Sequence, residues 1–398
     1  QFFAKTAANI RANPNVTLIL VDCLTGDQFA LDVRFVRSVD SGPLFNKVSL
    51  QLRASSAQVG MAEIMRLRSA DIFRVLQIDK VPSPVETIPL AASRQPVSLP
   101  ALADAIQAIE QQAEAEDIID RLLHSVGTVV GYRHALVLIP DVQRECFVTT
   151  GSMGYEHSGL SSEITGLEGL IGAAAANRQT IKISDMSRVR RFGEAIAKGE
   201  AVSEDMARAV AFPELPMAMS QIAVPMLDRG DVIGILFVES PERMAFRNED
   251  EAALEMLARE AARALKRSER VADRTEAETA PPAANATASG RAVRVTHHRM
   301  DDSIFVDDAY VVKGIAGALL RLMIERHLEE GRCEFSNREL RLALAARMPE
   351  IKDNLETRLL LLRRRLEEKQ APVRVVRTGR GRIRLDSSGP LILVAAQE

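Results

Sequence analysis

The chain has 398 residues, of which 46% are hydrophobic and 26% charged, and its formal net charge is −3. This length predicts two to four domains with cores of their own, and the charge excludes a protein that is cationic throughout, so any affinity for nucleic acid must be local. The three cysteines Cys23, Cys146 and Cys333 are scattered, without a CxxC pair or metal-ligand spacing. Their pattern excludes a disulfide framework and favours the reducing cytoplasm.

No segment of the sequence indicates a membrane or a secretory route. The longest apolar runs, VIGILFV and LILVD, have the length of strands and are far too short to span a bilayer. No secretory signal is visible. Because the chain begins with Gln1 inside an amphipathic helical pattern, we expect its natural N-terminus to lie further upstream.

Two shifts in composition divide the chain. The segment TEAETAPPAANATASG at residues 275–290 has no large apolar side chain and cannot bury enough surface to fold. A softer boundary is the run of residues 80–100, which has five prolines. The sequence therefore predicts an α+β multidomain protein with the following parts: a first module at 1–83, a proline-rich connector at 84–100, a middle module at 101–268, a disordered linker at 269–300 and a last module at 301–398.

The first module begins with a short helix over residues 2–13, followed by strands in VTLILVD and FALDVRFV around a TGD turn. After a loop, AEIMRLRSADIFRVLQID predicts a helix and then a strand. The run KTAANIRANPNVTLILVD…MAEIMRLRSADIFRVLQID resembles the FMN-binding split β-barrels of the pyridoxamine 5′-phosphate oxidase-like superfamily over about residues 1–80. The barrel strands that normally precede this helix are not present, so the resemblance is to part of a barrel.

This resemblance implies a homodimer and a cofactor, either FMN, a deazaflavin or haem. Lys5 and Thr6 stand where the superfamily often places groups that contact the cofactor's phosphate, and a lysine beside a helix N-terminus adds charge to free backbone N–H groups. The alternative is that Lys5 is a solvated helix residue. The whole module has two interpretations. It is either an oxidase or a degenerate barrel that serves as a dimerisation scaffold.

The middle module opens with ALADAIQAIEQQAEAEDIIDRLLHSV, which predicts one long amphipathic helix from Ala101 that would also suit signalling between subunits. Strands are predicted in HALVLIP and ECFVTTG, a hairpin with a DRGD turn in SQIAVPMLDRGDVIGILFVES, and a second long helix in FRNEDEAALEMLAREAARALKRS. This order resembles a GAF domain, an α/β sensory domain, over about residues 105–268. The resemblance implies a pocket for a cyclic nucleotide, a bilin, haem or another small metabolite, or no ligand at all.

Few residues of the middle module are candidates for holding a ligand. The NKFDE-type signature of cyclic-nucleotide binding is not evident, and Cys146 lies in a predicted strand as a small core residue. Among His124, His134 and His157, the last lies in the loop GYEHSGLSS and is best placed as an axial haem ligand, although each could also be a surface or core residue. The sequence has no HExxH motif, no phosphate-binding loop and no nucleophile–histidine–acid pattern, so catalysis is not indicated.

The last module reads as strands in SIFVDDAYVVK, helices in GIAGALLRLMIERHLEEG, FSNRELRLALAARM and DNLETRLLLLRRRLEEKQ, and a hairpin in VRVVRTGRGRIRL. Ser336 and Glu339 form a capping box at the start of the second helix. This order resembles the winged helix-turn-helix of the OmpR/PhoB-type response regulators over about residues 303–386. SNREL matches the opening of their second helix, LETRLLLLRRRLE their recognition helix and VRTGRGRIRL their wing.

Ten basic and two acidic residues lie between Arg358 and Arg384. Arginine can bind phosphate or guanine, so this stretch favours contact with DNA, and the alternative is a solvated face paired with Glu356, Glu367 and Glu368. The candidate DNA-binding residues are Arg358, Arg364, Arg365, Arg377, Arg380, Arg382 and Arg384.

The leucines of the third helix fall into two groups. Leu355, Leu359, Leu362 and Leu366 recur at helical spacing and should face the core. Leu360 and Leu361, in contrast, occupy positions where the response regulators usually carry polar or basic DNA-facing residues. These two would either present an apolar strip to the phosphate-lined groove of DNA or pack at a dimer or interdomain interface.

Together the modules predict a cytoplasmic, homodimeric regulator in which a ligand- or redox-sensing GAF domain and split barrel control a DNA-binding winged helix. The alternative is a flavin- or haem-dependent oxidoreductase with a regulatory GAF domain. A protein-interaction module that uses Leu360 and Leu361 is a third interpretation.

Overall fold

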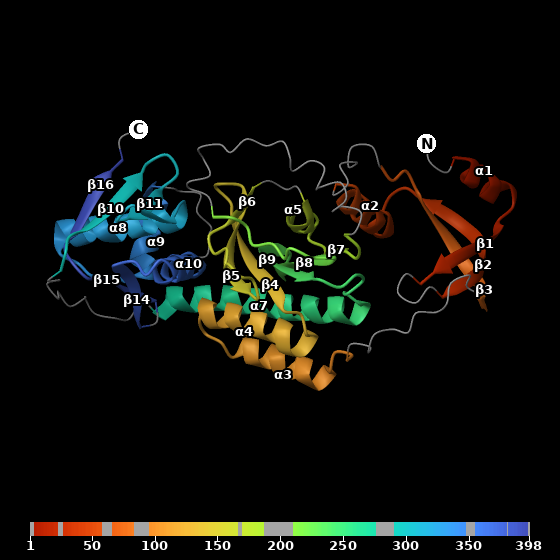
Figure 1. Cartoon of the computed structure of the whole chain (residues 1–398), viewed down its shortest axis with the longest axis horizontal. Coiled ribbons are helices and arrows are strands. Elements are labelled where there is room, and N and C mark those ends of the chain that lie inside the picture. The colour runs from red at the N-terminus through yellow and green to blue at the C-terminus, as the bar shows by residue number, and fades with distance from the viewer. Residues whose placement is uncertain are drawn as a thin grey trace. The chain divides into compact units, whose positions relative to one another are not determined.

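The computed structural model describes residues 4–22, 27–57, 66–82, 95–165, 169–186, 210–275, 290–347, 355–379 and 381–396. They divide between two compact units (Figure 1). Unit 1 lies within residues 1–96, and unit 2 lies within residues 97–186 and 193–398.

Unit 1 contains an antiparallel sheet with the strand order β1-β2-β3. Its described elements are α1 (Ala4–Ala12), β1 (Asn15–Val21), β2 (Gln28–Val39), α2 (Pro43–Ala57) and β3 (Ala70–Val81). The predicted first helix and the strands are confirmed. Most of the TGD turn and the first half of the helix expected in AEIMRLRS lie outside the described residues, and the second half, residues 66–69, is not helical.

Helix α2 corrects our prediction of a loop at this place. Gly42 has a φ of +91° and accepts a hydrogen bond from the backbone of Asn46, and Pro43 opens the helix. Proline suits the first helical turn because its missing N–H would have no partner there. Leu50 is 7% exposed, so the helix buries only a narrow apolar face. Such a weak amphipathic pattern is easily missed in a sequence.

The first half of unit 2 is a six-stranded antiparallel sheet with the order β6-β5-β4-β9-β8-β7. Its elements are α3 (Leu99–Glu110), α4 (Ala115–Ser125), a π-helical turn (Val126–Val130), β4 (His134–Asp141), β5 (Cys146–Met153), β6 (Glu163–Thr165), α5 (Gly169–Asn177), β7 (Ile181–Ile183), β8 (Ser220–Asp228), β9 (Asp231–Ser240) and α7 (Asn248–Thr275). Helices α3, α4 and α7 cover one face of this sheet (Figure 1). The predicted strands, the hairpin with its DRGD turn and the closing helix are confirmed.

The single long helix predicted from Ala101 is wrong, because the chain breaks between α3 and α4. The break lies at residues 111–114, which have the sequence QQAE and where Glu114 has an extended backbone. On a continuous helix the nine residues from Ile109 to Ile118 would turn them to opposite faces, at about 100° per residue. Both side chains are nevertheless fully buried in one core. The break lets both apolar faces pack on the same side of the sheet.

The second half of unit 2 has a four-stranded sheet with the order β12-β11-β10-β16 and a three-stranded sheet with the order β13-β15-β14. Its elements are β10 (Val293–His298), β11 (Ser303–Val306), β12 (Ala309–Val312), α8 (Ile315–Glu330), β13 (Glu334–Ser336), α9 (Asn337–Arg347), α10 (Leu355–Glu368), β14 (Val373–Gly379), β15 (Arg382–Ser387) and β16 (Leu391–Ala395).

The three predicted helices and the hairpin of the second half are confirmed. The Ser336 hydroxyl accepts a hydrogen bond of 3.2 Å from the backbone N–H of Glu339, so Ser336 caps α9 as expected. The range 269–300, which we expected to be a disordered linker, contains ordered ends. Helix α7 runs to Thr275, and β10 pairs with both β11 and β16.

Candidate functional site

Helix α10 lies where the two halves of unit 2 meet. The leucines predicted to face the core are buried, and they belong to the core of the second half. Leu360 is 3% exposed and packs instead into the core of the first half, while Leu361 joins the core of the second half. Cys146 and Val148 of β5 reach in the opposite direction, into the core of the second half. Leu360 therefore lies at the interdomain interface, which is one of the alternatives predicted for it.

Two of the candidate arginines of α10 bind the backbone of the first half. The Arg358 Nη2 atom donates a hydrogen bond of 2.5 Å to the carbonyl oxygen of Pro140, and the side chain is 3% exposed. The Arg364 Nη1 atom donates a hydrogen bond of 3.0 Å to the carbonyl oxygen of Thr150. These carbonyls lie on neighbouring interior strands, β4 and β5, so both guanidinium groups are held by the backbone of the six-stranded sheet.

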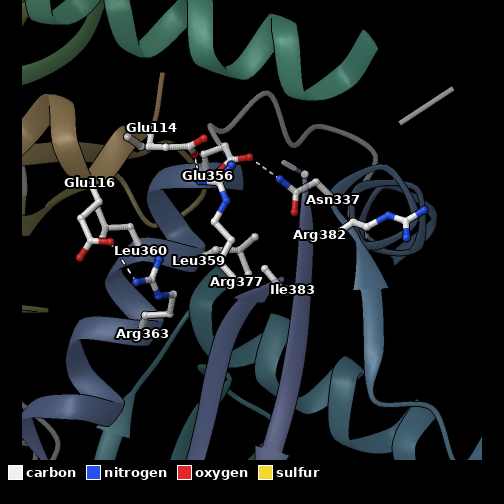
Figure 2. Close-up of a pocket in the computed structure, with 12 residues that line it drawn as sticks. Glu114, Glu116, Asn337, Glu356, Leu359, Leu360, Arg363, Arg377, Arg382 and Ile383 are labelled. Atoms are coloured by element: carbon white, nitrogen blue, oxygen red, sulfur yellow. Dashed lines mark hydrogen bonds and ion pairs between the residues drawn. The ribbon is translucent and has the colours of Figure 1, made fainter. Parts of the chain in front are cut away.

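Acidic side chains of the first half face basic side chains of the second. The Arg364 Nη2 atom lies 2.5 Å from the Asp120 Oδ1 atom, and the Arg363 Nη2 atom lies 2.9 Å from the Glu116 Oε2 atom. Figure 2 shows Glu116 of α4 directed at Arg363 of α10. Further ion pairs across the same contact are Glu114–Arg377, Glu163–Lys313 and Glu269–Arg341. The contact is therefore complementary in charge as well as apolar.

A small cleft lies between α4, α10 and the β14–β15 hairpin (Figure 2). Glu114, Glu116, Leu360, Arg363 and Arg377 are among its lining residues. Its volume is about 30 Å³, which is room for about one water molecule. The cleft is thus a narrow seam between the two halves and is too small for a metabolite.

The remaining candidate arginines point elsewhere. The Arg365 Nε atom donates a hydrogen bond of 2.9 Å to the carbonyl oxygen of Val311, within the second half. Arg384 pairs with Asp386 of its own strand, with 2.7 Å between Nε and Oδ1. Arg382 is half-buried and lines the cleft, although its side chain points away from Glu116 in Figure 2. Arg380 lies outside the described residues. The structure thus brings Arg358, Arg364 and Arg377 together at the interface, and the role of the whole set in DNA binding stays a prediction.

In unit 1, the residues expected near a cofactor are at the surface. Lys5 and Thr6 are both exposed in the first turn of α1. Most side chains of β1 and many of those of β3 are exposed too. The described part of unit 1 therefore presents no enclosed site for FMN or haem, and the binding of either stays a prediction.

A buried polar cluster surrounds Glu239 on the sheet of the first half. Leu236 and Val238 of β9 face the helices, so strand alternation turns Glu239 to the opposite face. Its carboxylate accepts hydrogen bonds of 2.8 Å from the Tyr155 hydroxyl, 2.8 Å from the Gln221 amide and 3.2 Å from the Leu215 backbone N–H. Burial raises the pKa of Glu239 despite these donors. Sequence reasoning missed this cluster, although a glutamate inside the apolar run VIGILFVES was a signal.

The histidines lie at the margin of this cluster. The His134 ring meets the Tyr155 ring edge to face, with 5.4 Å between their centroids, and burial together with Arg133 lowers the pKa of His134. His157 is exposed in the loop between β5 and β6, as its predicted loop position requires, and His124 is exposed on α4. The binding of haem by His157 stays a prediction.

A sheet with helices on one face and a buried polar cluster on the other is an architecture suited to a sensory domain. The model of the GAF domain family matches residues 114–265, and this part of the chain is a GAF domain. A GAF domain indicates small-molecule sensing in signal transduction. No curated protein matches the chain. Among the described residues, no helix has both the length and the apolar character that crossing a membrane requires.

Solved GAF structures resemble the chain over less than half its length. The GAF domain of an Acinetobacter phosphoenolpyruvate-protein phosphotransferase is 18% identical, covers 44% of this chain and 95% of its own, and has a TM-score of 0.36. Free methionine-R-sulfoxide reductase from Neisseria meningitidis is 17% identical, covers 43% of this chain and 89% of its own, and has a TM-score of 0.33. A putative GAF sensor protein from Burkholderia vietnamiensis is 18% identical, covers 43% and 89%, and has a TM-score of 0.32. Similarities this low do not transfer an activity to this chain.

Proposed function

We propose that this protein is a ligand-sensing transcriptional regulator, in which the GAF domain controls a DNA-binding winged helix formed by the second half of unit 2. The observation that carries the proposal is the arginine-rich helix α10 with its following hairpin, in the same compact unit as a GAF domain. Between Arg358 and Arg384 there are ten basic and two acidic residues, although the whole chain has a net charge of −3. Such a local excess favours binding to phosphate.

The order of elements in the second half supports the winged-helix interpretation. Helices α8, α9 and α10 precede the hairpin β14–β15, and β13, just before α9, pairs with β15 of that hairpin. In winged-helix proteins of this order the third helix enters the major groove and the hairpin contacts the backbone beside it. Helix α10 and the β14–β15 hairpin would take these two roles.

The GAF domain would sense a small molecule on the sheet face that carries Glu239. A ligand there can act on α10 only if it prefers one arrangement of the GAF domain over another, because a ligand shifts an equilibrium by its differential affinity alone. Strands β4 and β5 connect the two places directly, since they hold Arg358 and Arg364 by their carbonyl groups. We propose a cytoplasmic homodimer as the working form. A flavin or haem in unit 1 would add a redox input, and the visible absorption spectrum of the purified chain tests for it.

Binding of the full chain to a pool of random-sequence duplexes at two salt concentrations tests the proposed function. We expect binding that weakens steeply with salt, because each phosphate contact releases counterions. The variant Arg382→Ala/Arg384→Ala should bind more weakly and show a shallower salt dependence. A matched control, Arg133→Ala/Arg270→Ala, removes two exposed arginines elsewhere in unit 2 and should bind as the wild type does. The proposal would be overturned if no duplex binds at low salt either to the wild type or to the variant Glu116→Lys/Asp120→Lys, in which α4 no longer attracts Arg363 and Arg364 of α10.

A further inference from the structure

We propose that the GAF domain inhibits DNA binding by covering α10, so that the structure is a closed state which must open before DNA can bind. The proposal rests on the proposed function, because it takes α10 and its hairpin as the DNA-binding surface. It adds a specific competitor for that surface: the acidic side chains of α4 together with backbone carbonyl groups of β4 and β5.

The first observation is that the contact removes α10 from solvent. Arg358 and Leu360 are each 3% exposed, and the Arg364 side chain is 14% exposed. Two of these residues donate hydrogen bonds to backbone carbonyls of β4 and β5, at 2.5 and 3.0 Å. A DNA duplex needs the space that α4 and the strands β4 and β5 occupy, and a major groove cannot admit α10 while α4 lies beside it. Binding to DNA and to the GAF domain are therefore mutually exclusive.

The second observation is that α4 offers the chemistry of a nucleic-acid backbone. Glu116 and Asp120 are four residues apart on one face of α4, and they meet the neighbouring residues Arg363 and Arg364 of α10. Glu114, just before α4, pairs with Arg377 of β14. Carboxylates and phosphates accept the same charge-assisted hydrogen bonds from a guanidinium group. In the closed state, carboxylates of the GAF domain thus form the ion pairs with these arginines that DNA phosphates would form in the open state.

The third observation is that the contact also has an apolar component. Leu360 is buried in the GAF core, and Cys146 and Val148 of the GAF domain are buried in the core of the second half. Salt screens the ion pairs, yet it does not weaken this apolar burial. High salt should consequently disfavour DNA without opening the closed state, and a GAF ligand that disturbs β4 or β5 is the natural trigger for opening.

A charge reversal on the GAF side tests the occlusion without changing the DNA-binding residues. In Glu116→Lys/Asp120→Lys the two lysines repel Arg363 and Arg364. We expect this variant to bind the random duplex pool about tenfold more tightly than its control, because two ion pairs become repulsive. The control is Asp104→Lys/Asp117→Lys, in which both positions are exposed on α3 and α4 and neither takes part in the ion pairs with α10 described above. Both variants change the net charge equally, so the comparison removes the general effect of added positive charge on DNA affinity.

Hydrogen exchange provides a second readout that needs no substitution. When the wild type is saturated with duplex, the amides of α4 should exchange faster, because DNA has displaced α10 from the GAF domain. Equal duplex affinity of the two variants, or unchanged exchange in α4 of the DNA complex, would overturn the occlusion while leaving DNA binding established. If neither the wild type nor the charge-reversal variant binds duplex, both the proposed occlusion of α10 and the proposed DNA-binding function are wrong. Should the variant aggregate, the exchange experiment on the wild type decides alone.

Discussion

The sheet of unit 1 and the sheet of the GAF domain are both built from strands rich in valine, isoleucine and leucine, but their side chains have opposite surroundings. In β8 and β9 of the GAF domain, Ile222 and Leu236 are fully buried. In β1 and β3 of unit 1, Ile19 is 55% and Ile78 is 61% exposed. The difference teaches that apolar strands alone do not make a core. Helices α3, α4 and α7 supply the cover that the GAF sheet needs.

Within its described residues, unit 1 has little such cover. Its buried apolar side chains are Ile10, Val33 and Leu50, with exposed fractions between 2 and 8%. Each buried aliphatic side chain contributes about 1.5–3 kcal/mol, which does not offset the conformational entropy lost in ordering a sheet and two helices. The two regions should therefore differ in their ability to fold alone.

The largest expected effect follows from separating the two regions. Residues 97–398, produced alone, should keep a cooperative thermal transition and elute as a compact species. Residues 1–82, produced alone, should show no cooperative transition and should aggregate, because the apolar sheet stays exposed. Circular dichroism melting and size-exclusion chromatography measure both outcomes. A cooperative melt of residues 1–82 would break the comparison.

Truncating one isoleucine in each sheet sharpens the comparison at the level of single side chains. Ile235→Ala removes a fully buried side chain from β9 and should lower the free energy of unfolding by about 2–5 kcal/mol. Ile78→Ala makes the same chemical change in β3, where the side chain is 61% exposed. This substitution should change the free energy of unfolding by less than about 0.5 kcal/mol. Chemical denaturation monitored at each unit measures the two values. Similar losses at both sites would show that the sheet of unit 1 is covered.

A glycine in the GAF core should show how closely the helices pack on the sheet. A Cβ atom at Gly151 of β5 would lie 2.5 Å from the Ile119 Cγ2 atom of α4, so Gly151→Ala should cost about 1–3 kcal/mol. Gly127→Ala is the matched control, because its nearest neighbour, the Met153 Sδ atom, lies 3.6 Å away at an ordinary contact distance. The melting temperatures of both variants measure the difference. A Gly151→Ala protein as stable as Gly127→Ala would mean that α4 moves readily on the sheet.

The sequence predicted those features that depend on local periodicity. The strands of the GAF sheet, the leucines of α10 that face the core and the capping role of Ser336 all follow from residues a few positions apart. The break between α3 and α4 was missed, because it depends on a core that both helices share. The partner of Arg358 could not be predicted either, since Pro140 lies 218 residues away in the chain. A pattern of charges shows that arginines are concentrated but not what they contact.

The smallest expected effect concerns the buried polar cluster around Glu239 in the GAF domain. The described residues of the unit 1 sheet contain no comparable cluster. Burial raises the pKa of Glu239, with a further contribution from Glu214. The folded state therefore holds this proton more tightly than the unfolded chain does. The resulting stability is fully present below the usual glutamate pKa of about 4.5 and is lost as the pH rises through the raised value.

Glu239→Gln removes this titration, together with part of the acceptor capacity that serves Tyr155, Gln221 and the Leu215 N–H. The variant should be less stable than the wild type in acid by about 0.5–1.5 kcal/mol, because the larger amide group must replace the protonated carboxyl group in the hydrogen bonds of the cluster. The gap should then narrow as the pH rises towards neutrality, since only the wild type must ionise a buried carboxyl group. Thermal melts of both proteins between about pH 4 and pH 7 measure the gap. A gap that stays constant would mean that Glu239 is already ionised throughout this range, with its buried charge fully compensated by its three donors.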